Sequence, residues 1–255
     1  MCLLVFALRA HPDYSLILAG NRDERHARAA APAAFWPEAP QLLAGRDLEA
    51  GGTWLGVTAG GRYAVITNYR DGLDPPKAPR SRGELTTGFL TGDLSAADYL
   101  HEVQQRAREY GAFGLLCGDR ESLHYYSNRG GGPAEVEPGI HGLSNHLLDT
   151  PWPKVRSAAT RMKFLLETGA VTGEALFRLL ADRTPAADDT LPDTGIGLER
   201  ERLASATFMV DPDYGTRCST LLLLHRDGGI QFAERRFDAA GESLETRRFQ
   251  FAAEP

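Results

Sequence analysis

The residue with the most distinctive chemistry is Cys2, which directly follows the initiator methionine of a 255-residue chain. If Met1 is removed, Cys2 becomes the chain terminus and carries both a thiol and a free α-amine. An α-amine with a pKa of about 7.7–8.0 can accept the proton of a thiol whose pKa is about 8.5. Cys2 would then be a nucleophile with its own base. The alternative is a buried strand cysteine, and while Met1 remains its backbone nitrogen is an amide that cannot act as a base.

The charged cluster at residues 21–24 follows the second apolar stretch of the chain. An antiparallel hairpin would bring Arg22 back beside Cys2. A guanidinium group there favours the thiolate and can orient a carbonyl or carboxylate group. Asp23 could hold the terminal ammonium group or the arginine. A surface salt-bridge cluster is the alternative interpretation of these residues.

Asn68 and Asn145 each end an extended stretch of the chain. Asparagine amides are neutral donors that can stabilise an oxyanion, although asparagine is also a common turn residue. Arg217 enters a strand whose residues 221–224 are all leucine, so its charge needs a partner or a pocket. By strand alternation Cys218 faces the opposite way, and we expect it in the core.

Composition limits the class of protein. The net charge of −6 argues against a nucleic-acid partner, which favours a basic face. The three cysteines (Cys2, Cys117 and Cys218) show no paired spacing, which indicates a reducing compartment without disulfides. The apolar opening is too short to span a bilayer and lacks a cleavage-site pattern. We therefore expect a cytoplasmic protein with no membrane span.

Periodicity and turn residues predict an α+β chain that forms one domain over residues 1–255. The predicted strands cover residues 3–8, 16–19, 62–67, 113–117, 122–127, 207–210, 217–225, 230–236 and 244–251. The predicted helices cover residues 81–90, a segment capped by Ser95, and residues 152–168 and 174–182. Residues 27–40, 74–79 and 185–192 are predicted loops. The N-terminal hairpin is expected to pair with the C-terminal meander inside a sandwich of two sheets, with helices outside.

Seven short segments, in this order and spacing, carry a resemblance to the NRDE family, also called the TANGO2 or transport-and-Golgi-organisation family. They are MCLL (1–4), NRDE (21–24), GGTWLG (51–56), TNYR (67–70), SRG (81–83), LSN (143–145, with Trp152 and Lys154) and GTRCST (215–220). The resemblance implies a four-layer αββα sandwich of two antiparallel sheets, the N-terminal-nucleophile hydrolase fold. It also makes Trp54, Tyr69 and Arg70 candidate substrate-binding residues.

A more distant similarity, to penicillin acylases and bile salt hydrolases of the choloylglycine type, implies catalytic roles. Cys2 matches the nucleophile, Arg22 the arginine of the second strand, Asn145 an oxyanion donor, Arg217 the late arginine and, more weakly, Asn68 a second donor. One departure is Arg25, which stands where those hydrolases have an aspartate. Asp23 or Glu24 could substitute for it.

Two functions follow as hypotheses. The first is an amidohydrolase that cleaves a non-peptide C–N bond in a small molecule, with no cofactor. The second is a non-catalytic member of the family that binds or transports haem or a lipid-like ligand. Histidines 11, 26, 141 and 146 lack a second ligand at metal spacing, so no metal site is expected. No glycine-rich phosphate loop is present.

Overall fold

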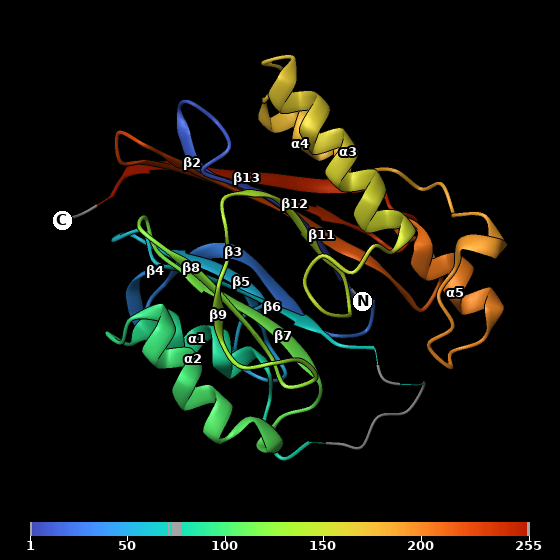
Figure 1. The fold of residues 1–255 in the computed structure, drawn as a ribbon, viewed down its shortest axis with the longest axis horizontal. Helices are drawn as coiled ribbons and strands as arrows, with labels where there is room; N and C mark the ends of the chain where they lie inside the picture. The colour runs from blue at the N-terminus through green and yellow to red at the C-terminus, as the bar shows by residue number, and fades with distance from the viewer. Residues whose placement is uncertain (1, 71, 73–77, 254–255) are drawn as a thin grey trace.

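Two antiparallel β-sheets stack face to face in the computed structural model, which describes residues 2–70, 72 and 78–253 (Figure 1). The six-stranded sheet has the order β10 (Gly139–Leu143), β1 (Cys2–Leu8), β2 (Tyr14–Arg25), β11 (Tyr214–His225), β12 (Gly229–Phe237) and β13 (Ser243–Ala252). The seven-stranded sheet has the order β3 (Ala30–Trp36), β4 (Ala39–Asp47), β5 (Leu55–Thr58), β6 (Tyr63–Asn68), β7 (Phe113–Gly118), β8 (Leu123–Ser127) and β9 (Ala134–Glu135). Met1 and most of the loop predicted at 74–79 lie outside the described residues.

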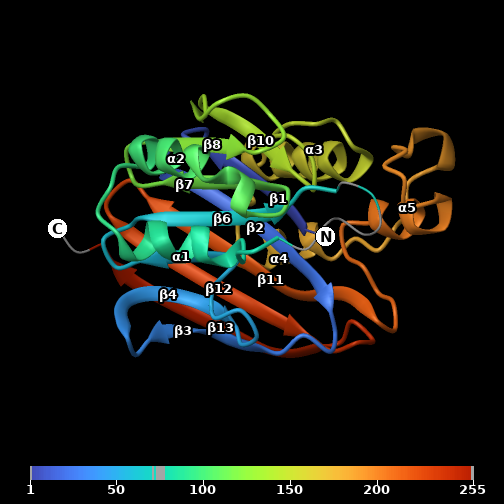
Figure 2. The same ribbon diagram turned by 90° about the horizontal axis from the view of Figure 1, so that it is seen from below.

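Helices cover the outer face of each sheet. The pair α1 (Gly83–Thr91) and α2 (Ala96–Gln105) packs on the seven-stranded sheet, and the pair α3 (Pro153–Glu167) and α4 (Gly173–Leu180) packs on the six-stranded sheet. A fifth helix, α5 (Leu198–Ser205), lies beyond the end of the sheets in both views (Figure 2). Single 3₁₀ turns occur at Ala107–Glu109 and Asp188–Thr190. The predicted α+β, four-layer αββα sandwich is confirmed.

Strand alternation divides the core into layers. In β1, Leu4 and Phe6 point between the two sheets, whereas Leu3 and Val5 point outward beneath α3 and α4. The leucines of β11 divide in the same way. The central strands β1, β2 and β11 are therefore buried on both faces, which explains their consecutive apolar residues.

The pairing of β2 with β11 joins the two ends of the chain, as the sequence predicts. The charged cluster at 21–24 lies inside β2, which runs on to Arg25, and does not follow its end. A register shift occurs in β11 between Thr216 and Cys218. Cys218 is buried, as expected.

Two predictions of local structure are wrong. The predicted loop at 27–40 contains β3 and the start of β4. Pro32 lies where the β3–β4 register shifts, at an edge strand that tolerates proline. The predicted strand at 207–210 is irregular chain, buried except at Val210, in which Phe208 donates its backbone N–H to the Asp182 carbonyl. Helix α5, which the sequence did not predict, is described below. No helix among the described residues is long and apolar enough to cross a membrane.

Candidate active site

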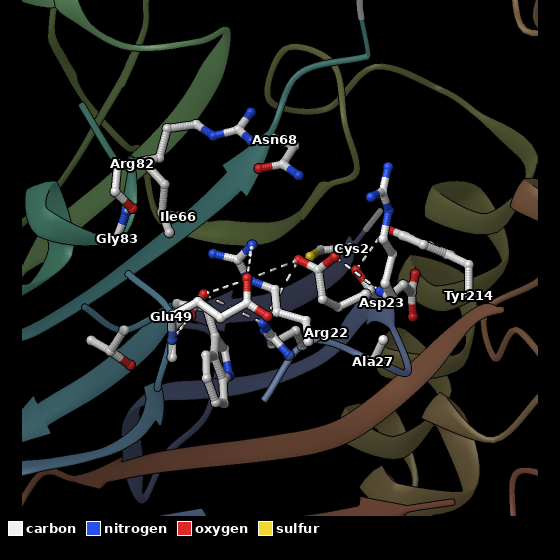
Figure 3. Close-up of a pocket in the computed structure, with 17 residues that line it drawn as sticks. Cys2, Arg22, Asp23, Ala27, Glu49, Ile66, Asn68, Arg82, Gly83 and Tyr214 are labelled. Atoms are coloured by element: carbon white, nitrogen blue, oxygen red, sulfur yellow. Dashed lines mark hydrogen bonds and ion pairs between the residues drawn. The ribbon is translucent and has the colours of Figure 1, made fainter. Parts of the chain in front are cut away.

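A cavity of about 690 Å³ opens beside Cys2 between the two sheets (Figure 3). Its wall is formed by the start of β1, the end of β2 and the turn after it, parts of β4 and β6, and the start of α1. Eight of its 17 lining residues are charged, four of them basic (Arg22, Arg25, Arg28 and Arg82) and four acidic (Asp23, Glu24, Asp47 and Glu49). A volume of this size accepts a small molecule.

Cys2 is half-buried at the head of β1 and pairs with Arg22 in β2, as the hairpin predicts. Its backbone is fixed from the end of β10. Asn145 Oδ1 accepts a hydrogen bond from the Cys2 nitrogen at 3.1 Å, and Ser144 Oγ donates to the Cys2 carbonyl at 2.9 Å. The thiol-bearing residue therefore has a defined position at the cavity wall.

Asn145 connects the two sheets at this point. Its side chain is only 1% exposed, and its Nδ2 donates to the Asn68 carbonyl at the end of β6 over 2.8 Å. Its own carbonyl accepts from the backbone nitrogen of Arg70 at 2.8 Å. The backbone has a φ of +54°, a left-handed conformation that asparagine tolerates better than most residues. The side chain of Asn68 itself lies at the cavity (Figure 3).

Arg22 is buried, with only 6% of its surface exposed, so the surface-cluster interpretation is wrong for this residue. Its guanidinium carbon lies 4.4 Å from the centre of a Trp54 ring. Glu24 and Asp47 carboxylates approach it at 3.7 and 3.8 Å. Trp54 thus serves as a platform for Arg22, and both residues line the cavity.

Asp23 lies on the cavity wall, yet it is only 2% exposed. Thr216 Oγ1 donates to its Oδ1 at 2.7 Å, and the Tyr214 hydroxyl donates to its carbonyl at 2.7 Å. Burial raises the pKa of the Asp23 carboxyl, while Lys154, the Thr216 hydrogen bond and Arg22 act in the opposite direction.

Lys154, at the start of α3, is a buried cation to which the sequence assigns no role beyond its place beside the segment at 143–145. It is 3% exposed, and its ammonium group makes no hydrogen bond within the described chain. Burial lowers its pKa to about 8, although Asp23, Cys2 and Glu201 favour its charged form. A buried lysine poised near neutral pH is a frequent feature of functional sites.

Tyr69 and Arg70 lie apart from the cavity lining. The Tyr69 hydroxyl is hydrogen-bonded to His146 Nε2 at 2.7 Å. Arg70 Nη1 contacts Glu201 Oε2 of α5 at 2.6 Å, and its guanidinium carbon lies 4.8 Å from the centre of a Trp152 ring. The structure therefore gives Arg70 a place in a buried ion pair that holds α5.

Arg217 also lies outside the cavity lining. Its Nη1 donates to three backbone carbonyls at the end of β2 and in the turn after it, those of Arg25, His26 and Arg28, at 2.9, 2.9 and 3.3 Å. This stretch borders the cavity through Arg25 and Arg28. The structure thus brings Cys2, Arg22, Asp23, Trp54, Asn68 and Asn145 together, and places Tyr69, Arg70 and Arg217 behind them.

Asn21, the first residue of the cluster, anchors the scaffold. Its Nδ2 donates to the carbonyls of Leu180 and Thr207 at 2.9 and 2.8 Å, and Ser219 donates to its Oδ1 at 2.6 Å. It joins β2 to the end of α4 and to the irregular segment before β11. Four charged lining residues were not predicted from the sequence: Arg28, Asp47, Glu49 and Arg82. Only Arg82 lies in a segment that carried the resemblance.

Among the residues that the structure describes, no three His, Cys, Asp or Glu side chains gather as a metal site. The cavity wall instead offers a thiol, amide groups and guanidinium groups. These groups can attack a carbonyl carbon, stabilise its developing negative charge and orient a polar ligand.

The chain was compared with known protein families, and one family matches almost its whole length. The sequence model described as "Transport and Golgi organisation 2" matches residues 1–239. The chain belongs to this family. The Transport and Golgi organisation protein 2 homologue of Bos taurus is 36% identical over 92% of each chain. The Homo sapiens homologue is 36% identical over 98% of this chain and 99% of its own.

A solved structure shows where else this fold occurs. A Caenorhabditis elegans ortholog of N-acylethanolamine-hydrolyzing acid amidase superposes with a TM-score of 0.51, at 9% identity. The match covers 87% of this chain and 92% of that one. At this identity the likeness shows the fold alone, which is that of the N-terminal-nucleophile hydrolases.

Proposed function

We propose that the chain, once Met1 has been removed, is an N-terminal-cysteine amidohydrolase that cleaves a non-peptide C–N bond in a small molecule. One observation carries the proposal: Cys2 lies at the cavity wall with its main-chain nitrogen held by Asn145 at 3.1 Å. In the processed chain this nitrogen is the α-amine, so base and nucleophile belong to one residue whose position is fixed.

The reaction has two steps. The α-amine takes the thiol proton, the sulfur attacks the carbonyl carbon, and a C–S bond forms. When the tetrahedral intermediate collapses, the C–N bond breaks and the proton passes from the ammonium group to the leaving nitrogen. Water, deprotonated by the same amine, then attacks the thioester, which releases the carboxylic acid and restores the thiol.

The neighbouring residues take the supporting roles. Asn145 and Asn68 are the candidate oxyanion donors: Asn145 Nδ2 has a second N–H besides the one bonded to the Asn68 carbonyl, and the Asn68 side chain lies at the cavity. Arg22 orients the carbonyl compound from its position over Trp54. Asp23 balances positive charge at the terminus.

Three predicted site residues that lie outside the cavity lining, Arg217, Arg70 and Tyr69, act by holding other residues in place. Arg217 holds the turn after β2 through its carbonyl contacts. Arg70 and Tyr69 hold Asn145 and the residue after it, because the Arg70 backbone nitrogen donates to the Asn145 carbonyl and the Tyr69 hydroxyl is hydrogen-bonded to His146. These three are positioning residues in this proposal. The amide-hydrolysing activity named for the C. elegans structural neighbour is consistent with the reaction type.

The alternative is a carrier of haem or a lipid-like ligand. The cavity favours the hydrolase, because its described lining is rich in charged groups and includes no histidine that could ligate haem iron. A haem titration of the wild type and Cys2→Ala tests the alternative. Saturable binding by both proteins at micromolar haem would support the carrier, and no absorbance change would remove it.

The hydrolase is tested by intact mass spectrometry together with an electrophilic thiol probe. The other thiols are an internal control, because Cys117 and Cys218 are buried and burial raises the pKa of both. We therefore expect a single label on Cys2 and none on Cys2→Ala. Native protein that retains Met1, or a Cys2 that never reacts, would contradict the proposal.

A matched experiment separates reactivity from catalysis. The same chain is made with a cleavable N-terminal extension whose removal leaves Cys2 first. Acyl transfer from p-nitrophenyl acetate, followed as p-nitrophenolate release, should rise sharply on cleavage because only then is the α-amine free. Equal rates before and after cleavage would show that the amine is not the base.

A further inference from the structure

The charges that line the cavity are not equally neutralised. Arg28 Nε lies 2.7 Å from Asp47 Oδ2, and its Nη1 lies 3.3 Å from Glu49 Oε2. Arg22 lies within 4 Å of Glu24 and Asp47. Two of the four cavity arginines therefore share the acidic groups of the same wall.

Arg82 has a different environment. Its Nη1 donates to the Ala112 carbonyl at 3.0 Å, and no carboxylate of the described chain lies within ion-pair distance. The side chain is partly buried at the start of α1, and this burial lowers the pKa of its guanidinium group. A partly desolvated cation with no carboxylate in contact is costly, although Cys2 and Glu24 favour its charged form from beyond ion-pair distance. An anionic ligand would supply the missing charge.

The position of Arg82 relates it to the thiol. Figure 3 shows its side chain extending along one wall towards Asn68, with Cys2 and Asp23 on the opposite side of the same cavity. Cys2 also interacts electrostatically with Arg82. Among the neighbouring groups, it has the largest effect in favour of the charged guanidinium group. The remaining cavity arginine, Arg25, is the last residue of β2 and is exposed to solvent.

We propose that Arg82 binds an oxyanion group, a carboxylate or a phosphate, of the molecule whose carbonyl faces Cys2. This inference rests on the proposed function, because it names the substrate class of the same cavity: a small amide that carries a negative charge away from the scissile bond. Guanidinium groups suit this role, since their forked N–H groups match the two oxygens of a carboxylate or phosphate.

Two alkylating reagents of nearly equal size test the proposal on the thiol itself. Iodoacetate is anionic and iodoacetamide is neutral, and both transfer a carbon to sulfur with loss of iodide. The ratio of their second-order rate constants for Cys2 is compared with the ratio for free cysteine. We expect iodoacetate to be favoured about 10-fold or more relative to that reference, with a preference that falls as salt rises.

Variants assign the preference to Arg82. Arg82→Gln should return the ratio to the free-cysteine value, and Arg82→Lys should keep part of the preference because it keeps the charge. Arg200→Gln is the control, since it removes an exposed positive charge on α5, outside the cavity lining. An unchanged ratio in Arg82→Gln, or an equal loss in Arg200→Gln, would overturn the proposal.

A binding measurement keeps the inference separate from the proposed reaction. Isothermal titration of Cys2→Ala with N-acetylglycine, its neutral analogue N-acetylglycinamide and inorganic phosphate needs no reactive thiol. We expect Cys2→Ala with Arg82 intact to bind an anion, either N-acetylglycine or phosphate. Adding Arg82→Gln should weaken that binding about 10- to 100-fold and leave the binding of N-acetylglycinamide unchanged. If neither anion binds more tightly than the amide, the oxyanion site does not exist, whether or not Cys2 is catalytic. If anions bind but the processed protein transfers no acyl group, the proposed function fails and this site stands.

Discussion

Asn145 accepts a hydrogen bond from the backbone nitrogen of Cys2 at 3.1 Å, across 143 residues of sequence. The same amide donates to Asn68 in the opposite sheet. The Asn145 side chain therefore links the two sheets beside Cys2, the residue proposed to react. The scaffold and the proposed chemistry share one side chain.

Removal of this amide should slow acylation of Cys2 by about 100- to 1,000-fold, the usual effect of losing an oxyanion donor. The φ of +54° complicates a simple alanine substitution, because alanine in this conformation costs about 1–2 kcal/mol. Asn145→Gly removes the same amide without that backbone cost. We therefore expect Asn145→Ala and Asn145→Gly to be equally slow towards p-nitrophenyl acetate, with Asn145→Ala less stable in urea. A glycine variant that acylates at the wild-type rate would show that the amide is dispensable.

The sequence predicted the parts of the site that follow from neighbouring strands. The hairpin alone places Arg22 opposite Cys2, and the register confirms it. The pairing of the first hairpin with the last strands is also expected, because the sequence predicts strands at both ends of the chain with helices between them. The positions of Asn68 and Asn145 at strand ends were recognised, but their hydrogen bond was not predictable, since it joins different sheets.

The features that the sequence predicts wrongly, or does not predict, have physical explanations. Segment 30–36 is rich in alanine and proline, so its composition resembles a loop, but strand pairing with β4 overrides that preference. Helix α5, with the sequence LERERLAS, has charged residues on all sides and shows no apolar stripe. It is held instead by a buried ion pair and by polar contacts such as the hydrogen bond from the Ala186 nitrogen to Ser205 Oγ. Similarly, the isolation of Arg82 depends on where acidic residues from other elements lie, which the sequence alone does not show.

The Arg70–Glu201 pair explains how α5 is held. The two side chains are 5% and 4% exposed, and Glu201 Oε1 also accepts from the nitrogen and hydroxyl of Thr194 at 2.9 and 2.5 Å. Glu201→Gln removes the buried counter-charge, so we expect the free energy of unfolding to fall by about 3–5 kcal/mol. Glu199→Gln, an exposed change of the same kind in the same helix, is the control. Equal denaturation midpoints for the two variants would contradict a structural role for the buried pair.

Gly45 leaves room for the Trp54 ring on which the Arg22 guanidinium group packs. A Cβ atom at this position would lie 2.4 Å from the Trp54 ring and 2.9 Å from Glu234 Oε2. Gly45→Ala should therefore displace the indole, destabilise the fold by about 1–3 kcal/mol and slow labelling of Cys2 without touching any lining charge. Gly60→Ala is the matched control, since its nearest neighbour would be 3.9 Å away. Normal labelling in Gly45→Ala would mean that Arg22 keeps its place without this platform.

Burial of Lys154 predicts a specific dependence of stability on pH. Its folded pKa of about 8 lies below the ordinary value of 10.5, so between these values the unfolded chain binds more protons than the folded chain. The free energy of unfolding must then rise as pH increases from about 8, by up to about 1.4 kcal/mol per pH unit. The buried tyrosines oppose this rise above about pH 10, because burial raises the pKa of Tyr63 and Tyr99.

The measurement is therefore a comparison between pH 8 and 10. Urea unfolding of Cys2→Ala, which removes titration of the thiol, is set against Cys2→Ala combined with Lys154→Met. The tyrosines and other groups are common to both proteins, so the difference between the two curves isolates Lys154. We expect stability to increase with pH relative to the Lys154→Met protein, by about 2–3 kcal/mol across the window. Parallel curves would show that Lys154 has the same proton affinity folded and unfolded, and hence that its ammonium group reaches water despite its position beneath the site.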